Sequence, residues 1–567
     1  MIICGIKLTH DASIALIEDG TLRFSVEIEK IGGNARYASL EHLSQVASVL
    51  SDFGYRVADV DQFVVDGWHP NHLLHLTPDG RVIDASSPAG VQQLRANPAA
   101  QRLDLAGYRY DELMTRSLGT ALGVNYASYC HYAGHVAGGY MTSPFAVAGR
   151  SSYVMCWDGA MVPMLYHVAD DRSVRQVAQL STLIGMAYFK LASTQPPFDG
   201  PVPFPQSLGL SGKIMAYIAH GTPYEHIVST LEEIHRDALL AVYGTPSPNP
   251  SAQDETSFHA LIAQMRSDIL QRLAHQNPDD VLAAIHAYLG NHVQRALVTA
   301  VEEDGQVSRS ICLVGGCALN IKWNRSIRES AAFDEVWVPP FPNDAGSAIG
   351  AACCELLRTQ GALEWQVYSG PALGPDVLET GWSRRECSLE DLAQLLYEGG
   401  RPVLYLQGRA ELGPRSLGHR SILAPATSSR MKDELNAIKG REAYRPIAPI
   451  CLAHAAPEVF APGSPDPHML FDHDVHAAWL PRVPAICHLD GTARIQTVTE
   501  CEEPDLFALL TAYERLSGVP LLCNTSANEH GRGFFPDVAS AMRWGRIPRI
   551  WSSGFLWEHD DRAVHAP

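Results

Sequence analysis

The sequence predicts an α/β fold with more than one domain, and three observations support this. The chain has 567 residues, which is too long for one hydrophobic core. Its 46% hydrophobic and 19% charged residues are typical of a folded globular protein. Residues 2–8 and 13–20 have the pattern of strands, 40–54 that of a helix and 60–68 that of another strand. Strands joined by a crossover helix are typical of α/β architecture.

Strands and helices continue to alternate along the next three hundred residues. The predicted elements are a helical region (105–145), a second set of strands (152–171), a helical block (about 223–303) with a Pro-rich interruption (244–255), a strand, Gly-Gly turn and helix (310–330), and a strand, Pro-rich turn and helix (335–357).

A second domain is predicted after a loop-like stretch near residues 370–385. A helix over 388–400 and a strand over 402–408 open it. We therefore expect one domain over 1–375, with the helical block as an insertion, and another over 380–567.

The composition excludes several classes of protein. A formal net charge of −19 argues against general affinity for nucleic acid or for anionic lipid. No run of about eighteen apolar residues predicts a membrane span, and the N-terminus lacks the pattern of a signal peptide. The twelve cysteines are scattered without a C-x-x-C motif, so reduced thiols and a cytoplasmic location are expected.

One window reverses the acidic balance. Residues 401–445 contain nine Lys or Arg against four Asp or Glu. A solvated basic face and an anion site explain this count equally well, so the choice depends on spacing and context.

Two histidines four residues apart, His131 and His135, are candidate metal ligands. They would project from one face of a helix, although two ordinary helical histidines are the common alternative. Asp158 follows an apolar strand, and Asp344 stands just before a helix, where it is either a ligand or an N-cap. Two imidazoles and two carboxylates together suit a borderline divalent metal such as Fe(II), Mn or Zn.

The segment "LVGGCALN" runs from a strand through Gly315-Gly316 to Asn320 before a helix. Backbone N–H groups at such a turn can bind an anion, and a tight structural turn is an equal alternative. Lys213 lies in a segment that departs from the Walker A pattern, which leaves it as a phosphate-binding or a structural lysine.

The most informative segment lies in the predicted second domain, between residues 408 and 446. Guanidinium groups bind phosphate oxygens bidentately, and several of them around glycine turns would suit a triphosphate that is being cleaved. A buried strand at 520–526 adds short polar groups that could meet a nucleotide. The residues selected on these grounds are Arg415, Arg420, Lys439, Arg441, Arg445, Asn524 and Ser526.

The order of the motifs resembles that of the ATP-dependent O-carbamoyltransferases of the NodU/CmcH/TobZ family, over nearly the whole chain. The motifs are, in order, "HDAS", "HYAGH", "WDG", "SGKIMAYIAHG", "GGCALN", "NDAGSAIGAA", "GRAELGPRSLGHRSIL", "KGREAYRPIAP" and "LLCNTSANEHG". The resemblance implies a TsaD-like domain of the actin and sugar-kinase ATPase fold, fused to an α+β YrdC-like domain. It implies that the YrdC-like domain makes carbamoyl-adenylate from carbamoyl phosphate and ATP, and that the TsaD-like domain transfers the carbamoyl group to a hydroxyl.

The resemblance also implies roles for particular residues. The family's metal ligands fall on His131, His135, Asp158 and Asp344, with Fe(II) expected first and Mg or Mn as alternatives. Its first-motif histidine falls on His10, near the transfer site. Its ATP-handling residues fall on Arg415, Lys439, Arg445, Arg494, Asn524 and Ser526.

The chain departs from the family at "EIEKIGGNARY". Most members have Glu-Glu-Arg and a pair of lysines there, whereas this chain has Glu29-Lys30 and a lone Arg36. The variant looks closer to the cephem carbamoyltransferases, and we take Arg36 as the cation that meets the adenylate.

We expect a small-molecule hydroxyl acceptor, a secondary metabolite or antibiotic, and a monomer or homodimer. The alternative that shares both domain types is a tRNA-modifying enzyme that uses threonylcarbamoyl-adenylate. A sugar kinase and a non-catalytic nucleotide sensor are two further alternatives. The helical block at 223–303 and the loop at 69–110 are the predicted sources of acceptor specificity.

Overall fold

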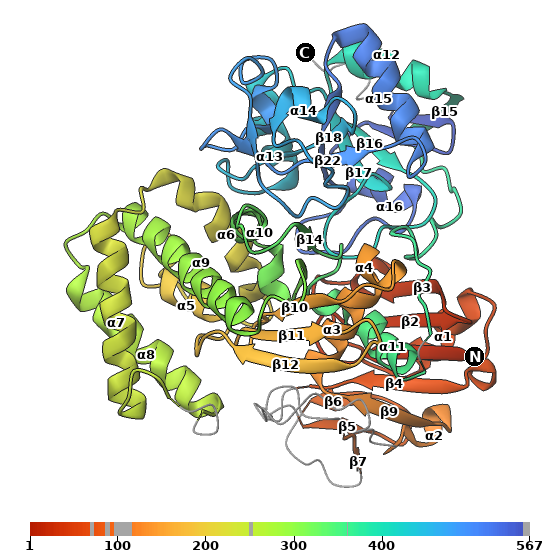
Figure 1. The fold of residues 1–567 in the computed structure, drawn as a ribbon. Helices are drawn as coiled ribbons and strands as arrows, with labels where there is room; N and C mark the ends of the chain where they lie inside the picture. The colour runs from red at the N-terminus through yellow and green to blue at the C-terminus, as the bar shows by residue number, and fades with distance from the viewer. Residues whose placement is uncertain (69–72, 85–90, 96–115, 249–252, 360, 560–567) are drawn as a thin grey trace. The chain divides into compact units, whose positions relative to one another are not determined.

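The computed structural model describes residues 1–68, 73–84, 91–95, 116–248, 253–359 and 361–559. It divides into two compact units (Figure 1). Unit 1 comprises Met1–Ser25 and Ser39–Trp365, and unit 2 comprises Val26–Ala38 and Gln366–Pro567. The short segment 26–38 therefore belongs to unit 2, although the chain on both sides of it belongs to unit 1.

Unit 1 contains two β-sheets built on the same plan. Their strand orders are β3-β2-β1-β4-β9-β8 and β12-β11-β10-β13-β14. In each sheet the central strand (β1 or β10) pairs antiparallel with the next strand of the chain and parallel with a later one. This duplicated plan is that of the actin and sugar-kinase ATPases, so the predicted fold class is confirmed.

The strands of the two sheets follow from runs of apolar and β-branched residues. All five residues of β10 are buried, which is typical of a strand covered on both faces. The bounds are β1 (Ile2–Lys7), β2 (Ser13–Glu18), β3 (Thr21–Glu27), β4 (Gln62–Asp66), β8 (Arg116–Ser117), β9 (Asn125–Tyr129), β10 (Ser152–Cys156), β11 (Met164–Val168), β12 (Val174–Gln179), β13 (Ser310–Val314) and β14 (Glu335–Trp337).

The prediction of continuous helix over 105–145 is wrong for residues 125–129, which form β9. Residues 105–115 lie outside the described residues. β9 pairs parallel with β4, so Tyr126 aligns with Phe63 and Tyr129 with Asp66. The aromatic residues of "NYASY" gain more from burial in this sheet than from local helix formation, and the next helix begins at His131.

Two helices separate the sheets of unit 1. α11 (Ser347–Arg358) packs on β1, β2 and β4, while α3 (His131–Met141) packs on β10 and β13. The two helices also pack on each other, backbone to backbone. A Cβ at Gly350 would lie 2.1 Å from the carbonyl oxygen of Gly134, and one at Gly138 would lie 3.1 Å from the Gly350 Cα.

We expect Gly350→Ala to lower the free energy of unfolding by about 1–3 kcal/mol or more, because the methyl group forces α3 and α11 apart. Chemical denaturation measures this change. Gly212→Ala on α6 (Leu210–Tyr217) is the matched control, since a Cβ there meets nothing within 4 Å. It should raise the stability by about 0.5–1 kcal/mol. Equal stability of the two variants would contradict the close packing of α3 on α11.

The predicted helical block is confirmed as three helices, α7 (Glu225–Tyr243), α8 (Glu255–Arg272) and α9 (Pro278–Glu303), which Figure 1 shows in yellow and green. Gly244 ends α7 with a φ of 71°. The side chain of Asp254 caps α8, and that of Asn277 caps α9 just before Pro278.

The remaining elements of unit 1 are short. They include α1 (Ser44–Asp52), α2 (Gly119–Leu122), α4 (Pro144–Val147), α5 (Ala187–Ala192), α10 (Ile321–Arg328) and a small sheet of β5 (Leu74–Leu76), β6 (Val82–Asp84) and β7 (Gln92–Gln93). The loop predicted to shape acceptor specificity, 69–110, lies mostly outside the described residues.

Unit 2 is an eight-stranded mixed sheet with helices and a small three-stranded sheet. The large sheet has the order β15-β25-β24-β16-β17-β23-β18-β22. Its strands are β15 (Trp382–Glu386), β16 (Val403–Leu406), β17 (Arg420–Ala424), β18 (Ala448–Leu452), β22 (Gln496–Val498), β23 (Leu521–Ser526), β24 (Arg549–Ser552) and β25 (Phe555–His559). The small sheet is β19 (Phe460–Ala461), β20 (His473–Val475) and β21 (Thr492–Ala493).

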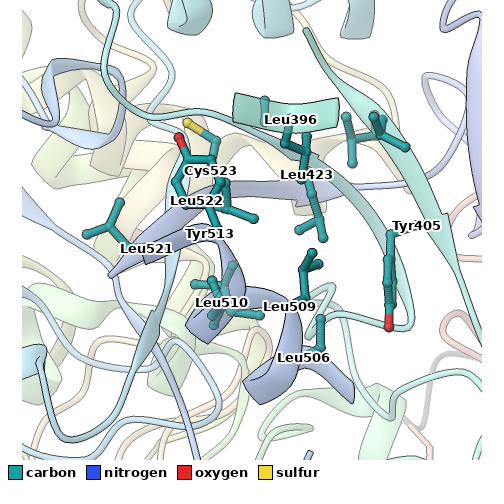
Figure 2. Close-up of a cluster of buried hydrophobic side chains, with 14 of the residues drawn as sticks. Leu396, Tyr405, Leu423, Leu506, Leu509, Leu510, Tyr513, Leu521, Leu522 and Cys523 are labelled. Carbon is teal, nitrogen blue, oxygen red and sulfur yellow. The ribbon is translucent and has the colours of Figure 1, made fainter. Parts of the chain in front are cut away.

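The core of unit 2 lies between this sheet and its helices. The helices are α12 (Leu389–Gly399), α13 (Ser429–Lys439), α14 (Ala456–Val459), α15 (Pro504–Ser517) and α16 (Val538–Trp544). Figure 2 shows Leu506, Leu509 and Leu510 of α15 beside Tyr405 of β16 and Leu423 of β17, all within one buried cluster. The spacing of the three leucines places them on one face of the helix.

Within the described residues, no helix is both long and apolar enough to cross a membrane.

Candidate functional site

The two histidines of the H-x-x-x-H motif lie on the first turns of α3. The helix begins at His131 because Cys130 has an extended backbone at the N-cap. Both imidazoles are 5% exposed, and their Nε2 atoms are 3.2 Å apart. The motif therefore presents two ring nitrogens to one buried point.

Two carboxylates from distant turns reach the same point. Asp344 Oδ1 lies 3.1 Å from His131 Nε2 and 3.5 Å from His135 Nε2. Asp158 follows β10, and its Oδ1 accepts a hydrogen bond from the Gly316 backbone. One ligand atom from each of the four residues lies within 4.8 Å of the others. We call His131, His135, Asp158 and Asp344 the His–Asp group.

The His–Asp group fits a divalent cation. His131 Nδ1 lies 2.8 Å from Asp66 Oδ2 and donates to it, which leaves a lone pair on Nε2. That lone pair faces Asp344 and the second imidazole, an arrangement that a cation stabilises. Burial alone would lower the pKa of His131, yet Asp66 and Asp344 raise it to about 10. The surroundings therefore favour positive charge, and the mixed N/O donors are those of a borderline metal.

Two charged residues that the motifs did not indicate, Lys7 and Asp66, complete the surroundings. Lys7 Nζ lies 3.0 Å from Asp66 Oδ2 and 2.9 Å from Asp344 Oδ2, and all three side chains are buried. Burial would raise the pKa of Asp344, but Lys7 and His131 hold it well below the usual value. The sequence contains a signal that could have indicated Asp66, because Asp66-Gly67 follows an apolar strand as Asp158-Gly159 does.

His10, the predicted transfer residue, lies beside the His–Asp group. Its Nε2 is 3.7 Å from Asp344 Oδ2, and its Nδ1 is 3.1 Å from Asp11 Oδ2. Phe204, which is largely exposed, meets the imidazole edge-on with ring centroids 5.4 Å apart. His10 keeps 24% of its side chain exposed, so it is open to a substrate while the ligand histidines are buried.

The Gly-Gly turn borders the same group. Gly315 has a φ of 87°, and a Cβ there would lie 2.4 Å from the Trp157 carbonyl oxygen. The Gly316 N–H is already used by Asp158. The Asn320 side chain caps α10 by accepting from two backbone N–H groups, which gives it a structural use. Lys213 is half-buried on α6 and is not a member of the group.

Unit 2 brings six basic side chains together. The pKa of Arg415 lies well below its usual value. The main cause is burial of the side chain, and the nearby cations Arg494, Arg36 and Arg445 add to it. The pKa of Lys439 is also well below its usual value, mainly because of burial and further because of Arg441, Arg36 and Arg445. Burial together with neighbouring arginines also lowers the pKa of Arg441 to about 9 and that of Arg494 to about 10. We call Arg36, Arg415, Lys439, Arg441, Arg445 and Arg494 the basic cluster.

Such a cluster of like charges repels itself and favours a bound anion. Four of its members come from the basic window at 401–445, and the other two come from outside it. Arg494 Nε is buried and has no hydrogen-bond partner in the described part of the chain. Two other cations of the window have different partners, since Arg401 pairs with Glu434 and Lys432 donates to the Cys487 carbonyl oxygen.

Arg420, also selected from the sequence, is used structurally. Its guanidinium donates to the carbonyl oxygens of Gln407, Gly408 and His419, and the side chain is buried. Each of these bonds fixes the chain between β16 and β17. We therefore leave Arg420 out of the basic cluster.

Lys439, Asn524 and Ser526 lie close to one another in unit 2. Lys439 Nζ donates to the carbonyl oxygens of Ser526 and Asn528, at 2.7 and 2.6 Å. Asn524 is buried on β23, where it donates to Ser416 O and to Gln496 Oε1. Because Lys439 belongs to the basic cluster and bonds to Ser526, the C-terminal end of β23 lies next to that cluster.

The segment 26–38 delivers Arg36 to unit 2. Lys30 Nζ donates to Glu27 Oε1 and to the carbonyl oxygens of Glu411 and Gly413, at 2.7, 2.7 and 2.8 Å. Arg36 N donates to Gly531 O. A Cβ at Gly533 would lie 1.8 Å from the Glu29 carbonyl oxygen, so the segment packs against this loop closely.

Comparison with known proteins places the chain among carbamoyltransferases. It matches the family described as "Carbamoyltransferase N-terminus" over residues 2–353 and "Carbamoyltransferase C-terminus" over 393–546. Nodulation protein U of Rhizobium tropici is 44% identical, over 100% of this chain and 98% of that protein. The 3'-hydroxymethylcephem-O-carbamoyltransferase of Streptomyces clavuligerus is 29% identical over 96% of each chain. Whole-chain identity is thus higher to the nodulation protein, although the segment 27–37 looked closer to the cephem enzymes.

Among solved structures, the activator of the 2-hydroxyisocaproyl-CoA dehydratase from Clostridium difficile is 12% identical, with a TM-score of 0.33. The comparison covers 64% of this chain and 97% of that chain. The two family matches together span most of the chain, in the order that the motifs predicted. The protein therefore belongs to the carbamoyltransferase family.

Proposed function

We propose that the protein is an ATP-dependent O-carbamoyltransferase that modifies a hydroxyl of a small molecule, with a secondary metabolite or antibiotic as the expected class of acceptor. Unit 2 would make carbamoyl-adenylate, and unit 1 would transfer the carbamoyl group. The family membership supports carbamoyl transfer, and the relatives' hydroxyl chemistry supports an oxygen acceptor.

The observation that carries this proposal is the basic cluster. Six cations occupy one part of unit 2, and in five of them burial and neighbouring arginines of the cluster lower the pKa. They require a substrate that brings several negative charges, as ATP and carbamoyl phosphate do. Guanidinium pairs would neutralise the charge that develops on the departing pyrophosphate.

The reaction proposed for unit 2 consumes carbamoyl phosphate, ATP and water, and releases phosphate and pyrophosphate. A carbamate oxygen forms a bond to the α-phosphorus of ATP, and the bond from that phosphorus to pyrophosphate breaks. The product is a mixed anhydride of carbamate and AMP. Its AMP portion is a good leaving group, which carbamate itself lacks.

In the reaction proposed for unit 1, the acceptor hydroxyl oxygen forms a bond to the carbamoyl carbon, and the bond from that carbon to the phosphate oxygen of AMP breaks. His10 would accept the hydroxyl proton at a ring nitrogen, since it is the partly exposed imidazole beside the His–Asp group. A divalent metal, with Fe(II) expected first, would be held by His131, His135, Asp158 and Asp344 and would stabilise negative charge on the AMP phosphate. Lys7 would keep Asp344 ionised.

The direct test is to mix the protein with ATP and carbamoyl phosphate and without acceptor. Mass spectrometry should then detect carbamoyl-adenylate, and pyrophosphate release should require carbamoyl phosphate. Release that requires threonine and bicarbonate instead would indicate the tRNA-modifying alternative. ADP as product would indicate a kinase, and no turnover with a panel of hydroxylated natural products would indicate a nucleotide sensor.

A further inference from the structure

Asp66 lies outside the four residues of the His–Asp group but contacts one of them directly. It stands at the end of β4, the strand that lies parallel between β1 and β9. Its Oδ2 is 2.8 Å from His131 Nδ1 and 3.0 Å from Lys7 Nζ. One carboxylate oxygen therefore accepts from both an imidazole and an ammonium group.

The surroundings of Asp66 accommodate a buried carboxylate. Asp66 is 2% exposed, and a Cβ on Gly134 of the next turn of α3 would lie 3.1 Å from Asp66 Oδ1. Lys7, on the neighbouring strand β1, supplies the charge that lets two buried carboxylates, Asp66 and Asp344, lie near each other. Without that ammonium group, only the imidazoles would offset the cost of burying the two carboxylates.

We propose that Asp66 is a positioning residue, which fixes the tautomer and the ring orientation of His131 so that Nε2 is the atom presented to a divalent metal. The inference rests on the metal site of the proposed function. His135 has no such carboxylate among its described contacts, so the two histidines of the motif would not be equivalent ligands. A carboxylate that accepts from the distal nitrogen of a ligand histidine also makes the histidine a stronger donor.

Replacement by asparagine, Asp66→Asn, separates this role from a purely structural one. The new amide side chain would keep the size of the carboxylate, and Lys7 would keep its pair with Asp344. If the carbonyl oxygen of that amide faces His131, the imidazole loses the charged partner that strengthens it. If the amide nitrogen faces His131, it donates to Nδ1 and moves the ring proton to Nε2, where it blocks metal binding.

The experiment compares four full-length proteins after removal of bound metal by a chelator: wild type, Asp66→Asn, Glu355→Gln and His135→Ala. Glu355 is the matched control, because it is buried in unit 1 and bonds to Tyr129 and Arg358, outside the His–Asp group. Co(II) affinity is measured by titration calorimetry, and the Co(II) visible absorption spectrum reports the ligand geometry. Thermal unfolding of the metal-free proteins checks the fold.

We expect Asp66→Asn to weaken Co(II) binding about 10–100-fold and to alter the absorption spectrum, while Glu355→Gln keeps wild-type values for both. Wild-type affinity and spectrum in Asp66→Asn would overturn the inference alone, provided His135→Ala loses binding. Equal binding by wild type and His135→Ala would overturn the metal site of the proposed function as well. Should Asp66→Asn not fold, Asp66→Ser serves in its place, with the same expected loss.

Discussion

Replacing Arg445 with methionine should reduce the rate of pyrophosphate release at least about 100-fold while leaving the ligand-free protein at least as stable as wild type. The loss of rate is expected because a guanidinium that stabilises developing phosphate charge is removed. The unchanged or higher stability is expected because Arg445 is one of several cations, most of them half-buried, that repel one another. Burial lowers the pKa of Arg445 first, Glu442 opposes this from 3.9 Å, and Arg36 lowers the pKa further. Methionine keeps most of the length of the side chain without the charge.

Two assays and one control test this expectation. Pyrophosphate release from ATP and carbamoyl phosphate measures the reaction proposed for unit 2, and transfer from synthetic carbamoyl-adenylate measures that proposed for unit 1. Arg430→Met is the matched control, because Arg430 is exposed on α13 in the same basic window and is not a member of the basic cluster. It should change neither rate. A variant of Arg445 that loses stability and both rates together would contradict an anion site and indicate a structural arginine.

A bound anion should also stabilise the protein. Pyrophosphate bound at the basic cluster would relieve its repulsion, so it should raise the melting temperature of wild type and of Arg430→Met. Arg445→Met should show a smaller increase, because it has both less repulsion to relieve and fewer groups to bind the anion. This comparison does not require turnover, so it tests the site even where the acceptor is unknown.

The sequence pattern predicts a helix or strand well where an apolar helix face or a continuous apolar run determines the local structure. The helices α7, α8 and α9 carry apolar residues at helical spacing and are bounded by Gly, Asp and Asn caps. The strand β10 is a continuous apolar run. By contrast, β9 was predicted as helix, because its identity as a strand depends on pairing with β4 some sixty positions earlier in the chain. Such pairing energy is absent from any local window.

Chemistry predicted which residues of the His–Asp group would gather, because the two histidines share one helix face and the two aspartates stand at turns that follow apolar segments. It did not predict Lys7 or Asp66, since lysine on a strand is ordinarily exposed. Their burial follows from mutual pairing, which only the folded sheet supplies. In the basic window at 401–445, the charge count alone does not separate structural cations from cations that could bind an anion. Charge count selects Arg420 as readily as Arg415, whereas the folded chain gives the Arg420 guanidinium four carbonyl oxygens to bond.

The path of residues 26–38 also lies beyond what local sequence can give. Lys30 bonds to the carbonyl oxygen of Glu411, 381 positions along the chain, and it is this anchor that brings Arg36 into unit 2. A lysine and an arginine in a Gly-rich segment have no local feature that distinguishes an anchor from a substrate-facing cation. Burial makes the distinction, because Lys30 is 3% exposed and Arg36 is exposed.

His10→Asn should lower carbamoyl transfer about 10²–10⁴-fold, the usual contribution of a general base, and leave pyrophosphate release unchanged. Asparagine can still hydrogen-bond at a similar position, but it cannot accept a proton from the acceptor hydroxyl. Transfer from synthetic carbamoyl-adenylate to an accepted hydroxyl compound measures the first rate, and His226→Asn, an exposed histidine on α7, is the control.

The outcomes of this experiment divide the possible roles of His10. Its ring lies 3.7 Å from Asp344 Oδ2, so a change there could also disturb the His–Asp group. Co(II) affinity equal to wild type, together with lost transfer, would assign the loss to the missing base. Co(II) affinity that falls in step with transfer would make His10 a support of the metal site instead, and equal loss of both half-reactions would contradict the assignment of transfer to unit 1. Because His10 is partly exposed and lies beside the carboxylates, whereas His131 and His135 are buried, the first outcome is the one that the structure predicts.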